Sequence, residues 1–548
     1  ALTMMRRVAL GRNAFSRPSY RTVHSAIRIL TARKATPGQR ATRLRPAPVA
    51  WTPGGRAWTW VELARANSES LCDRPLQSKL REAESPVRRD DSMTKPRMIP
   101  LRSPSEGLEA RLAMIAGATN TLDLQYYLWK SDAVGLLMVT KLIDAADRGV
   151  SVRLLVDDLR LRTRTHSIAS LSQHPNIEIK SFNPWFSRSS RFRAAAEFLR
   201  RFGQLDRRMH NKMMVADTTS AIIGGRNIAD EHFGLNDAFN LVDYDLLLSG
   251  VAIERLGEVF EAYWTSEPAV AAGVLDPKAT KSDLGPAVQS IRKRRIGQAT
   301  RIPSDLAAAT TLSDQITAGA IPVSEGDVAI TFDTPGDATD GPGTQVLKSL
   351  RQAIATAREE VVVLTPFFVP REVAIEIYRD VSNSGVSIKL LTNSLASNSG
   401  TISNSGLDNA RRAVIEAGVD LYELRSHAAD KALWELPQRP NAYLGLHGKL
   451  YTIDRNRVVL GSVNLDPRSK FINTEIGMTI ESSQLASEAV ETIEPLMSPQ
   501  NAWHVTIDGE DRLTWTCDEG STHTQPARSS LQRWADMALS KLPIRKYI

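Results

Sequence analysis

Two stretches of this chain repeat one pattern of polar residues. In each, a histidine is followed by a lysine two positions later, an aspartate seven, a glycine fourteen and an asparagine seventeen positions later. The copies are His210, Lys212, Asp217, Gly224 and Asn227, and His447, Lys449, Asp454, Gly461 and Asn464. One His-x-Lys pair alone says little, whereas two copies with matched offsets indicate a duplicated functional site.

The residue types in this pattern suit a phosphoryl group. Each His-x-Lys pair opens a predicted strand, so the histidine and the lysine point to the same face. Two histidines in different protonation states can serve as nucleophile and proton donor, while Lys212 and Lys449 stabilise negative oxygens. Asn227 and Asn464 add hydrogen bonds at a loop or helix start that favours anions. We therefore predict phosphodiester chemistry that uses neither a metal ion nor a cofactor.

Each histidine also needs an acid that orients its second ring nitrogen. Asp217 and Asp454 belong to the catalytic motif, but their position past the strand predicts that they support the turn. Asp245 and Glu475 lie in apolar stretches and are better candidates for orienting the histidines at the substrate site. The alternative is that both are solvated acids at strand edges.

A β-α-β order precedes each motif. The first half has predicted strands at 120–129 and 149–158 around a helix at 134–147, and the second half repeats this order between 360 and 394. Such an order predicts parallel strands with a crossover helix. We predict an α/β fold of duplicated α-β-α sandwich domains related by a pseudo-two-fold axis, with mixed, mostly parallel sheets. The predicted segments are a disordered Arg-rich tail (1–95), a first domain (96–269), a linker (270–325), a second domain (326–525) and a C-terminal tail (526–548).

The doubled pattern resembles the HKD signature of the phospholipase D superfamily. Other segments are similar to its bacterial cardiolipin synthase branch, among them Leu155-Val-Asp-Asp158, Gly224-Gly-Arg-Asn-Ile228 and Thr365-Pro-Phe-Phe-Val-Pro370. The similarity covers about residues 100–548 and is greatest to the C type of that branch, which lacks N-terminal membrane spans. It implies two phospholipase D-like domains whose active site lies where the halves meet.

The resemblance also implies an activity. It implies a phosphatidyltransferase that makes cardiolipin through a phosphohistidine, passing a phosphatidyl group to phosphatidylglycerol. The N-terminal histidine, His210, is then the nucleophile, and Arg207 and Arg208 before it favour its neutral form. Expected partners are anionic phospholipids (phosphatidylglycerol, with phosphatidylethanolamine as an alternative donor), a membrane surface and optionally a helper protein. The alternative function is hydrolysis, by a phospholipase D or a nuclease of the same superfamily.

Charge is distributed unevenly along the chain. Residues 1–61 hold twelve Arg and Lys and no acid, so the net charge of +8 leaves −4 for residues 62–548. This predicts no nucleic-acid partner for the enzyme module.

Because no run approaches the ~18 apolar residues of a spanning helix, we expect a peripheral protein of the bacterial inner membrane without a transmembrane helix. The acid-free tail also resembles a mitochondrial transit peptide, which makes a mitochondrial location the alternative; an over-extended reading frame upstream of Met93 explains the tail equally well.

The segment 188–202 combines arginines with apolar residues at near-helical spacing. Phe192, Ala195, Leu199 and Phe202 recur with arginines beside them. This pattern is typical of a helix that lies in an anionic membrane interface. It is equally typical of an amphipathic core helix with a solvated face.

The tail before residue 93 shows no pattern of a hydrophobic core. Deleting residues 1–92 should therefore leave the fold and the activity intact. Circular dichroism and an assay with detergent-solubilised lipid check this prediction. An insoluble or inactive truncated protein would contradict it.

Overall fold

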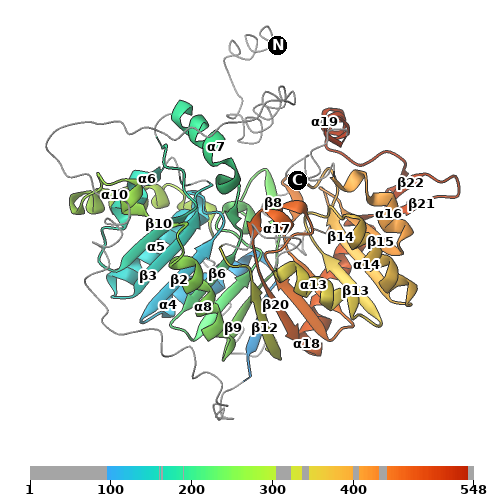
Figure 1. Cartoon of the computed structure of the whole chain (residues 1–548), viewed down its shortest axis with the longest axis horizontal. Helices are drawn as coiled ribbons and strands as arrows, with labels where there is room; N and C mark the ends of the chain where they lie inside the picture. The colour runs from blue at the N-terminus through green and yellow to red at the C-terminus, as the bar shows by residue number, and fades with distance from the viewer. Residues whose placement is uncertain are drawn as a thin grey trace, which may run out of the picture. The chain divides into compact units, whose positions relative to one another are not determined.

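The computed structural model describes residues 95–159, 161, 164–188, 191–303, 323–335, 345–398, 406–430 and 441–540 (Figure 1). The predicted disordered tail therefore lies outside the described residues, apart from residue 95.

Each half of the chain is built on one large mixed sheet. The strands of the first sheet are, in spatial order, β10 (Ala269–Ala271), β4 (Ile177–Phe182), β3 (Ser151–Asp157), β2 (Thr121–Tyr126), β6 (Lys212–Ala216), β7 (Ser220–Gly224), β9 (Asp245–Ser249), β1 (Arg97–Leu101) and β11 (Ser324–Glu325). Those of the second are β12 (Asp327–Phe332), β20 (Ile476–Glu481), β18 (Arg457–Gly461), β17 (Leu450–Ile453), β13 (Glu360–Leu364), β14 (Ser387–Asn393), β15 (Val419–Leu424), β21 (Ala502–Ile507), β22 (Leu513–Cys517) and β23 (Gly520–Thr522).

The predicted β-α-β units are confirmed in both halves. Strands β2 and β3 pair in parallel, as do β13 and β14. The prediction that the sheets are mostly parallel is wrong, because most neighbouring strands in both sheets are antiparallel. The reason is local: each motif strand, β6 or β17, turns back through a short hairpin, and a hairpin can join only antiparallel strands.

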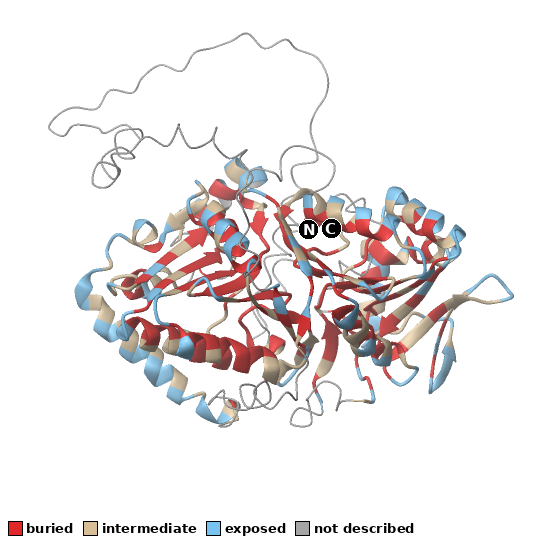
Figure 2. Cartoon of the chain, turned by 90° about the horizontal axis from the view of Figure 1, so that it is seen from below, coloured by how far each residue is buried: buried red, intermediate tan, exposed pale blue. Residues whose placement is uncertain are grey.

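Helices cover the outer faces of the sheets and also fill the space between them. They are α4 (Pro104–Gly117), α5 (Ala133–Asp147), α6 (Thr165–Leu171), α7 (Arg191–Leu205), α8 (Ala252–Trp264), α9 (Ala272–Leu275), α10 (Lys281–Ile296), α13 (Gln345–Ala355), α14 (Glu372–Asn383), α16 (Arg411–Glu416), α17 (Pro467–Phe471), α18 (Ser483–Ile493) and α19 (Ser530–Ser540). One core cluster contains residues of α8 and α18 together with strands of both sheets, so the halves share a hydrophobic core. Figure 2 shows the buried strands in red inside each half, with exposed residues on the outer helices.

The chain passes from one sheet to the other at Gly326. Strand β11 pairs with β1 of the first sheet, and β12, which follows Gly326, pairs with β20 of the second. A Cβ atom on Gly326 would lie 2.3 Å from the carbonyl oxygen of Glu481, so only glycine fits. Within the predicted linker, α10 packs on the first half through Leu284, Val288 and Ile291.

Two short parallel ladders join the halves directly. Strand β5 (Arg208–Met209) pairs with β19 (Asn473–Thr474), and β16 (Tyr443–Leu446) pairs with β8 (Phe239–Val242). In each pair, one strand comes from each half. The strand that ends just before a motif histidine is therefore fixed against the opposite half.

The motif aspartates tie the motif hairpins to the sheet. Asp217 has φ 51° and accepts hydrogen bonds from the backbone N–H groups of residues 119, 120 and 121, at 2.7–2.8 Å. Asp454 has φ 52° and accepts from the N–H groups of residues 358, 359 and 360, at 2.7–3.1 Å. Both carboxylates lie at the end of the motif strand remote from the histidine. The structure thus agrees with a turn-supporting role and places neither aspartate at the catalytic centre.

Replacing either aspartate should reduce stability and leave the chemistry intact. Asp217→Asn or Asp454→Asn keeps one oxygen acceptor for several N–H donors, so the free energy of unfolding should fall by about 1–3 kcal/mol. Urea unfolding and kcat measured on the same preparations check this. A large loss of kcat without a loss of stability would return the residue to the catalytic site.

Candidate active site

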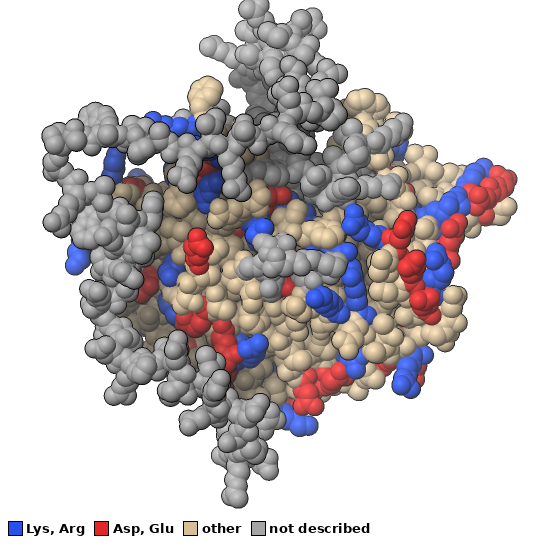
Figure 3. All heavy atoms as spheres, in the orientation of Figure 1, with Lys and Arg blue, Asp and Glu red and all other residues tan. Residues whose placement is uncertain are grey.

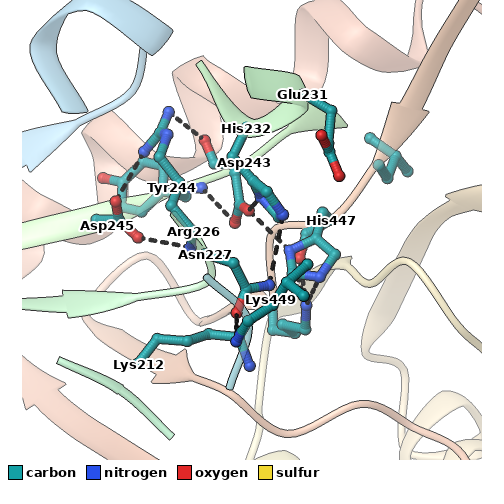
Figure 4. A network of polar contacts seen from close by, with 12 residues as sticks. Lys212, Arg226, Asn227, Glu231, His232, Asp243, Tyr244, Asp245, His447 and Lys449 are labelled. Carbon is teal, nitrogen blue, oxygen red and sulfur yellow. Dashed lines mark hydrogen bonds and ion pairs between the residues drawn. The ribbon is translucent and has the colours of Figure 1, made fainter. Parts of the chain in front are cut away.

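The ladders between the halves bring each motif histidine to an acid of the opposite half. The N–H of His210 donates to the carbonyl oxygen of Thr474, and that of His447 to Val242, at 2.9 and 2.7 Å. The next residue after Thr474 is Glu475, whose Oε2 lies 2.8 Å from His210 Nδ1. The next after Val242 is Asp243, whose Oδ2 lies 2.7 Å from His447 Nδ1 (Figure 4). An acid therefore contacts Nδ1 of each histidine. Nε2 is the ring nitrogen left for a substrate, and in His447 it lies 3.3 Å from Lys449 Nζ.

The two lysines are buried beside the histidines. Lys212 is 1% exposed and Lys449 is fully buried, and each donates from Nζ to the carbonyl oxygen of its own motif histidine. Burial lowers the pKa of Lys212 well below its ordinary value, and the charge of Lys449 lowers it further. Burial likewise lowers the pKa of Lys449 to about 8, against the opposing effect of nearby acids. The effect of Lys449 on the pKa of Lys212 fits two amino groups at one site, where an anion would stabilise their charged forms.

The two acids differ in charge state. Burial raises the pKa of Glu475 to about 7, and its other contacts are neutral hydroxyl donors, Ser462 and Ser469. Burial acts in the same direction on Asp243, but contacts with His447 and His232 hold the pKa of Asp243 well below its usual range. Near neutral pH, Asp243 is thus a full carboxylate beside His447, whereas Glu475 is close to its titration point beside His210.

The histidines are both kept neutral when the site is empty. Burial lowers the pKa of His210 well below 6.5, and Lys212 and Lys449 lower it further. Burial and Lys449 lower the pKa of His447 in the same way, but the Asp243 carboxylate opposes them. Arg208, predicted to act on His210, is instead buried with its Nη1 3.1 Å from Asp157 Oδ1.

His232 is a site residue that the sequence analysis missed. Its Nδ1 lies 3.0 Å from Asp243 Oδ2, its ring meets that of His447 edge-on with centroids 4.6 Å apart, and it is 2% exposed. Asn227 donates from Nδ2 to His232 Nε2 at 3.4 Å. The only sequence signal was its place five residues after a motif asparagine. His232, Asp243 and His447 offer ligand atoms within 4.8 Å of one another, a set able to hold a metal ion that the sequence analysis did not anticipate.

The prediction that Asp245 orients a histidine is wrong. Its Oδ2 accepts from Arg111 Nη2 at 2.9 Å and from Arg226 Nη1 at 3.1 Å, and all three side chains are buried (Figure 4). The acid that contacts His447 is Asp243, two positions earlier. Asp245 instead forms ion pairs with both arginines. Arg226 also donates to the carbonyl oxygen of Asp243.

The motif asparagines lie at the same site in different environments. Asn227 accepts from the N–H of Leu128 at 3.1 Å, which ties the motif loop to the end of β2. Asn464 donates its backbone N–H to Ser469 Oγ, and its Oδ1 is buried without a partner among the described residues. The structure therefore brings together His210, Lys212, Asn227, Glu475, His447, Lys449 and Asn464 and leaves out Asp217, Asp245 and Asp454.

Comparison with known proteins identifies the family. The family model described as "Cardiolipin synthase, PLD-like domain" matches residues 112–264 and 350–497, which together make up more than half of the chain. The chain belongs to this family. The two matched regions are the two halves described above, so the duplication of phospholipase D-like domains is confirmed.

Individual relatives agree with this assignment. Cardiolipin synthase C of Escherichia coli (strain K12) is 28% identical over 455 residues, covering 82% of this chain and 95% of the relative. Cardiolipin synthase 1 of Bacillus anthracis is 23% identical over 367 residues, covering 67% and 59%. The crystal structure of phosphatidylserine synthase from Haemophilus influenzae Rd KW20 has a TM-score of 0.54 at 14% identity, covering 83% of this chain and 98% of that one. The last is a likeness of fold alone.

The protonation of Glu475 should make the stability of this phospholipase D-like enzyme depend on pH. The pKa of Glu475 is raised from 4.5 to about 7 in the folded protein. The contribution of the protonated Glu475 side chain to the free energy of unfolding is therefore complete below pH 4.5 and is lost as the pH rises through 7. Glu475→Gln has no proton to lose. The free energy of unfolding of the variant, relative to wild type, should therefore rise between pH 4.5 and 7.5, by up to roughly 3 kcal/mol.

Urea titrations at several pH values measure this difference. Glu491→Gln, at an exposed position of α18, is the matched control and should follow the wild-type curve. Parallel curves for Glu475→Gln and wild type would mean that Glu475 is ionised throughout this range.

Proposed function

We propose that this protein is a phosphatidyltransferase that makes cardiolipin through a phosphohistidine intermediate. The observation that carries the proposal is the pair of His-x-Lys motifs, each oriented by an acid of the other half, in a chain of the cardiolipin synthase family. Relatives named as cardiolipin synthases support phosphatidylglycerol as a substrate. Phosphatidylethanolamine is the alternative donor, and a helper protein is compatible with the mechanism.

In the first step, His210 attacks phosphorus. Its Nε2 lone pair forms the N–P bond while the P–O bond to the donor's head-group alcohol breaks, and His447 gives that alcohol its proton. Lys212 and Lys449 bind the non-bridging oxygens, where negative charge builds up in the transition state. Binding of the phosphodiester brings negative charge close to Lys212 and Lys449 and stabilises their ammonium forms. The same negative charge raises the proton affinity of His447.

In the second step, a hydroxyl group of phosphatidylglycerol attacks the phosphohistidine. His447 takes the hydroxyl proton, the new P–O bond forms, and the N–P bond to His210 breaks. Hydrolysis differs only in that water replaces the lipid alcohol, so exclusion of water decides between transfer and hydrolysis.

The unequal acids support this division of roles. The Asp243 carboxylate stabilises the imidazolium form of His447, as a proton donor requires. Glu475, close to its titration point, gives His210 weaker support as a cation and favours the neutral nucleophile. His232 is a positioning residue in this proposal, because it holds Asp243 and Asn227 in place.

The proposed lipid substrates support a location at a membrane. No helix in the described part of the chain is long and apolar enough to cross a bilayer, and we propose peripheral attachment to the bacterial inner membrane. On the part of the face that is visible in Figure 3, Lys and Arg side chains are interspersed with Asp and Glu. This pattern does not favour a nucleic-acid partner, for which a basic surface is expected.

Lipid mass spectrometry tests the function. Purified protein is incubated with vesicles of phosphatidylglycerol, alone or with phosphatidylethanolamine, and cardiolipin with released glycerol or ethanolamine is the expected product. Phosphatidic acid as the main product would instead establish hydrolysis. Deuterated head groups on one lipid identify the donor.

The two histidine variants should fail at different steps. His447→Asn should still form a phosphatidyl-enzyme from a substrate with a good leaving group and then stall, because no base activates the acceptor. His210→Asn should form none. Each change should slow turnover by about 10²–10⁴ or more. Acid-labile label trapped on the His210 variant alone would exchange the two roles.

A further inference from the structure

Helix α19 is attached to the protein by its polar side. Gln532 donates from Nε2 to the carbonyl oxygen of Leu395 at 2.7 Å, and Arg533 donates from Nε to that of Gln525 at 3.1 Å. Asp536 is the one buried residue of the helix. A surface helix of a soluble protein ordinarily does the opposite and buries its apolar side.

The apolar side of α19 faces away from the protein. Leu531, Trp534 and Met537 are spaced three residues apart on one face and are 73%, 63% and 50% exposed. Such a row of large apolar side chains on the outside marks a contact surface for another apolar phase.

Helix α7 presents a second surface of the same kind. Its residues Ala194 and Phe198 are buried, with the ring of Phe198 stacked on Trp185 at 5.5 Å. Phe192 and Leu199, predicted from the sequence to share an apolar stripe, instead point outward and are 90% and 56% exposed. Of the ten large hydrophobic side chains exposed in the described residues, six belong to α19, to α7 or to Phe186 just before it.

The two helices belong to different halves and project from the same edge of the molecule. Figure 1 shows α7 and α19 at the top, with β8, which leads into Asp243, lower and between them. Arg193 and Arg200 are exposed on α7 beside Phe192 and Leu199. In the sequence, Lys541, Arg545 and Lys546 follow α19. Apolar side chains flanked by cations fit the interface of an anionic bilayer.

We propose that α7 and α19 together form the face by which this enzyme docks on an anionic phospholipid bilayer, with one contact on each half of the fold. The inference deepens the proposed function, whose substrates are lipids of such a bilayer. A bilayer can meet two separate helices at one edge of the molecule at once. A second protein copy would need a continuous complementary interface of about 1,200 Å² or more.

Vesicle flotation tests the α19 contact. Leu531→Gln/Trp534→Gln/Met537→Gln keeps good helix formers in α19 and should weaken binding to phosphatidylglycerol-containing vesicles at least tenfold. The matched control is Val274→Gln/Ile296→Gln/Val373→Gln, which removes equally exposed apolar side chains from α9, α10 and α14. It should float like the wild type.

Three further tests separate the contributions. Phe192→Gln/Leu199→Gln should weaken flotation to a similar extent, and Arg191, Arg193, Arg200 and Arg201 changed to Gln should weaken it on anionic vesicles more than on phosphatidylcholine. Brominated lipids should quench the fluorescence of the wild type more than that of Trp534→Phe. Unchanged flotation of the α19 variant, or equal quenching of both proteins, would overturn the proposal.

Activity distinguishes docking from catalysis. The α19 variant should turn over dihexanoyl-phosphatidylglycerol below its aggregation threshold at the wild-type rate and lose activity on vesicles. Loss of activity on the soluble lipid as well would mean that α19 is needed for the fold or the active site, and it would overturn the proposal. A wild-type dimer that the α19 variant converts to a monomer would also overturn it. A wild type that floats but makes no cardiolipin from either substrate would refute the proposed function and leave the docking face standing.

Discussion

The candidate site depends on one reciprocal contact: each half of the molecule supplies the acid that orients the other half's histidine. The backbone fixes this contact, because the residue before each acid accepts a hydrogen bond from the histidine's own N–H. Two short parallel ladders fix that register. Neither half alone therefore contains a complete site, and the shared core between the sheets holds the reacting groups in place.

Buried charge is the main cost of this arrangement. Two lysines, several acids and the arginines bound to Asp245 are removed from water, and an unpaired charge in such a place would be strongly destabilising. Ion pairs and hydrogen bonds within the site offset this cost. Asp245 neutralises Arg111 and Arg226, while the lysines contact backbone carbonyls and share one space. Burial lowers the pKa of both lysines, and an anion bound beside them would raise it again.

Internal symmetry is broken where the chemistry requires it. Asp243 and Glu475 occupy corresponding places in the repeats, but Asp243 contacts two imidazoles, whereas Glu475 contacts one imidazole and two serine hydroxyls. In the proposed mechanism, the resulting difference in charge state favours different roles for the two histidines. At the outer edge, α7 and α19 break the symmetry again, since two helices of unrelated sequence expose large apolar residues.

The sequence by itself determined the duplication, the β-α-β units and the two His-x-Lys pairs, because these follow from local spacing and hydrophobic pattern. The sequence could not decide whether Asp243 or Asp245 contacts His447, because the two residues are two positions apart and lie on the same face of any strand that contains both. The register between the halves made that choice through the bond from His447 to Val242. His232, the pairing of Arg208 with Asp157 and the outward side of α19 were likewise decided by contacts between segments far apart in sequence. Local patterns fix which side of an element is apolar, whereas only tertiary packing decides which side faces the core.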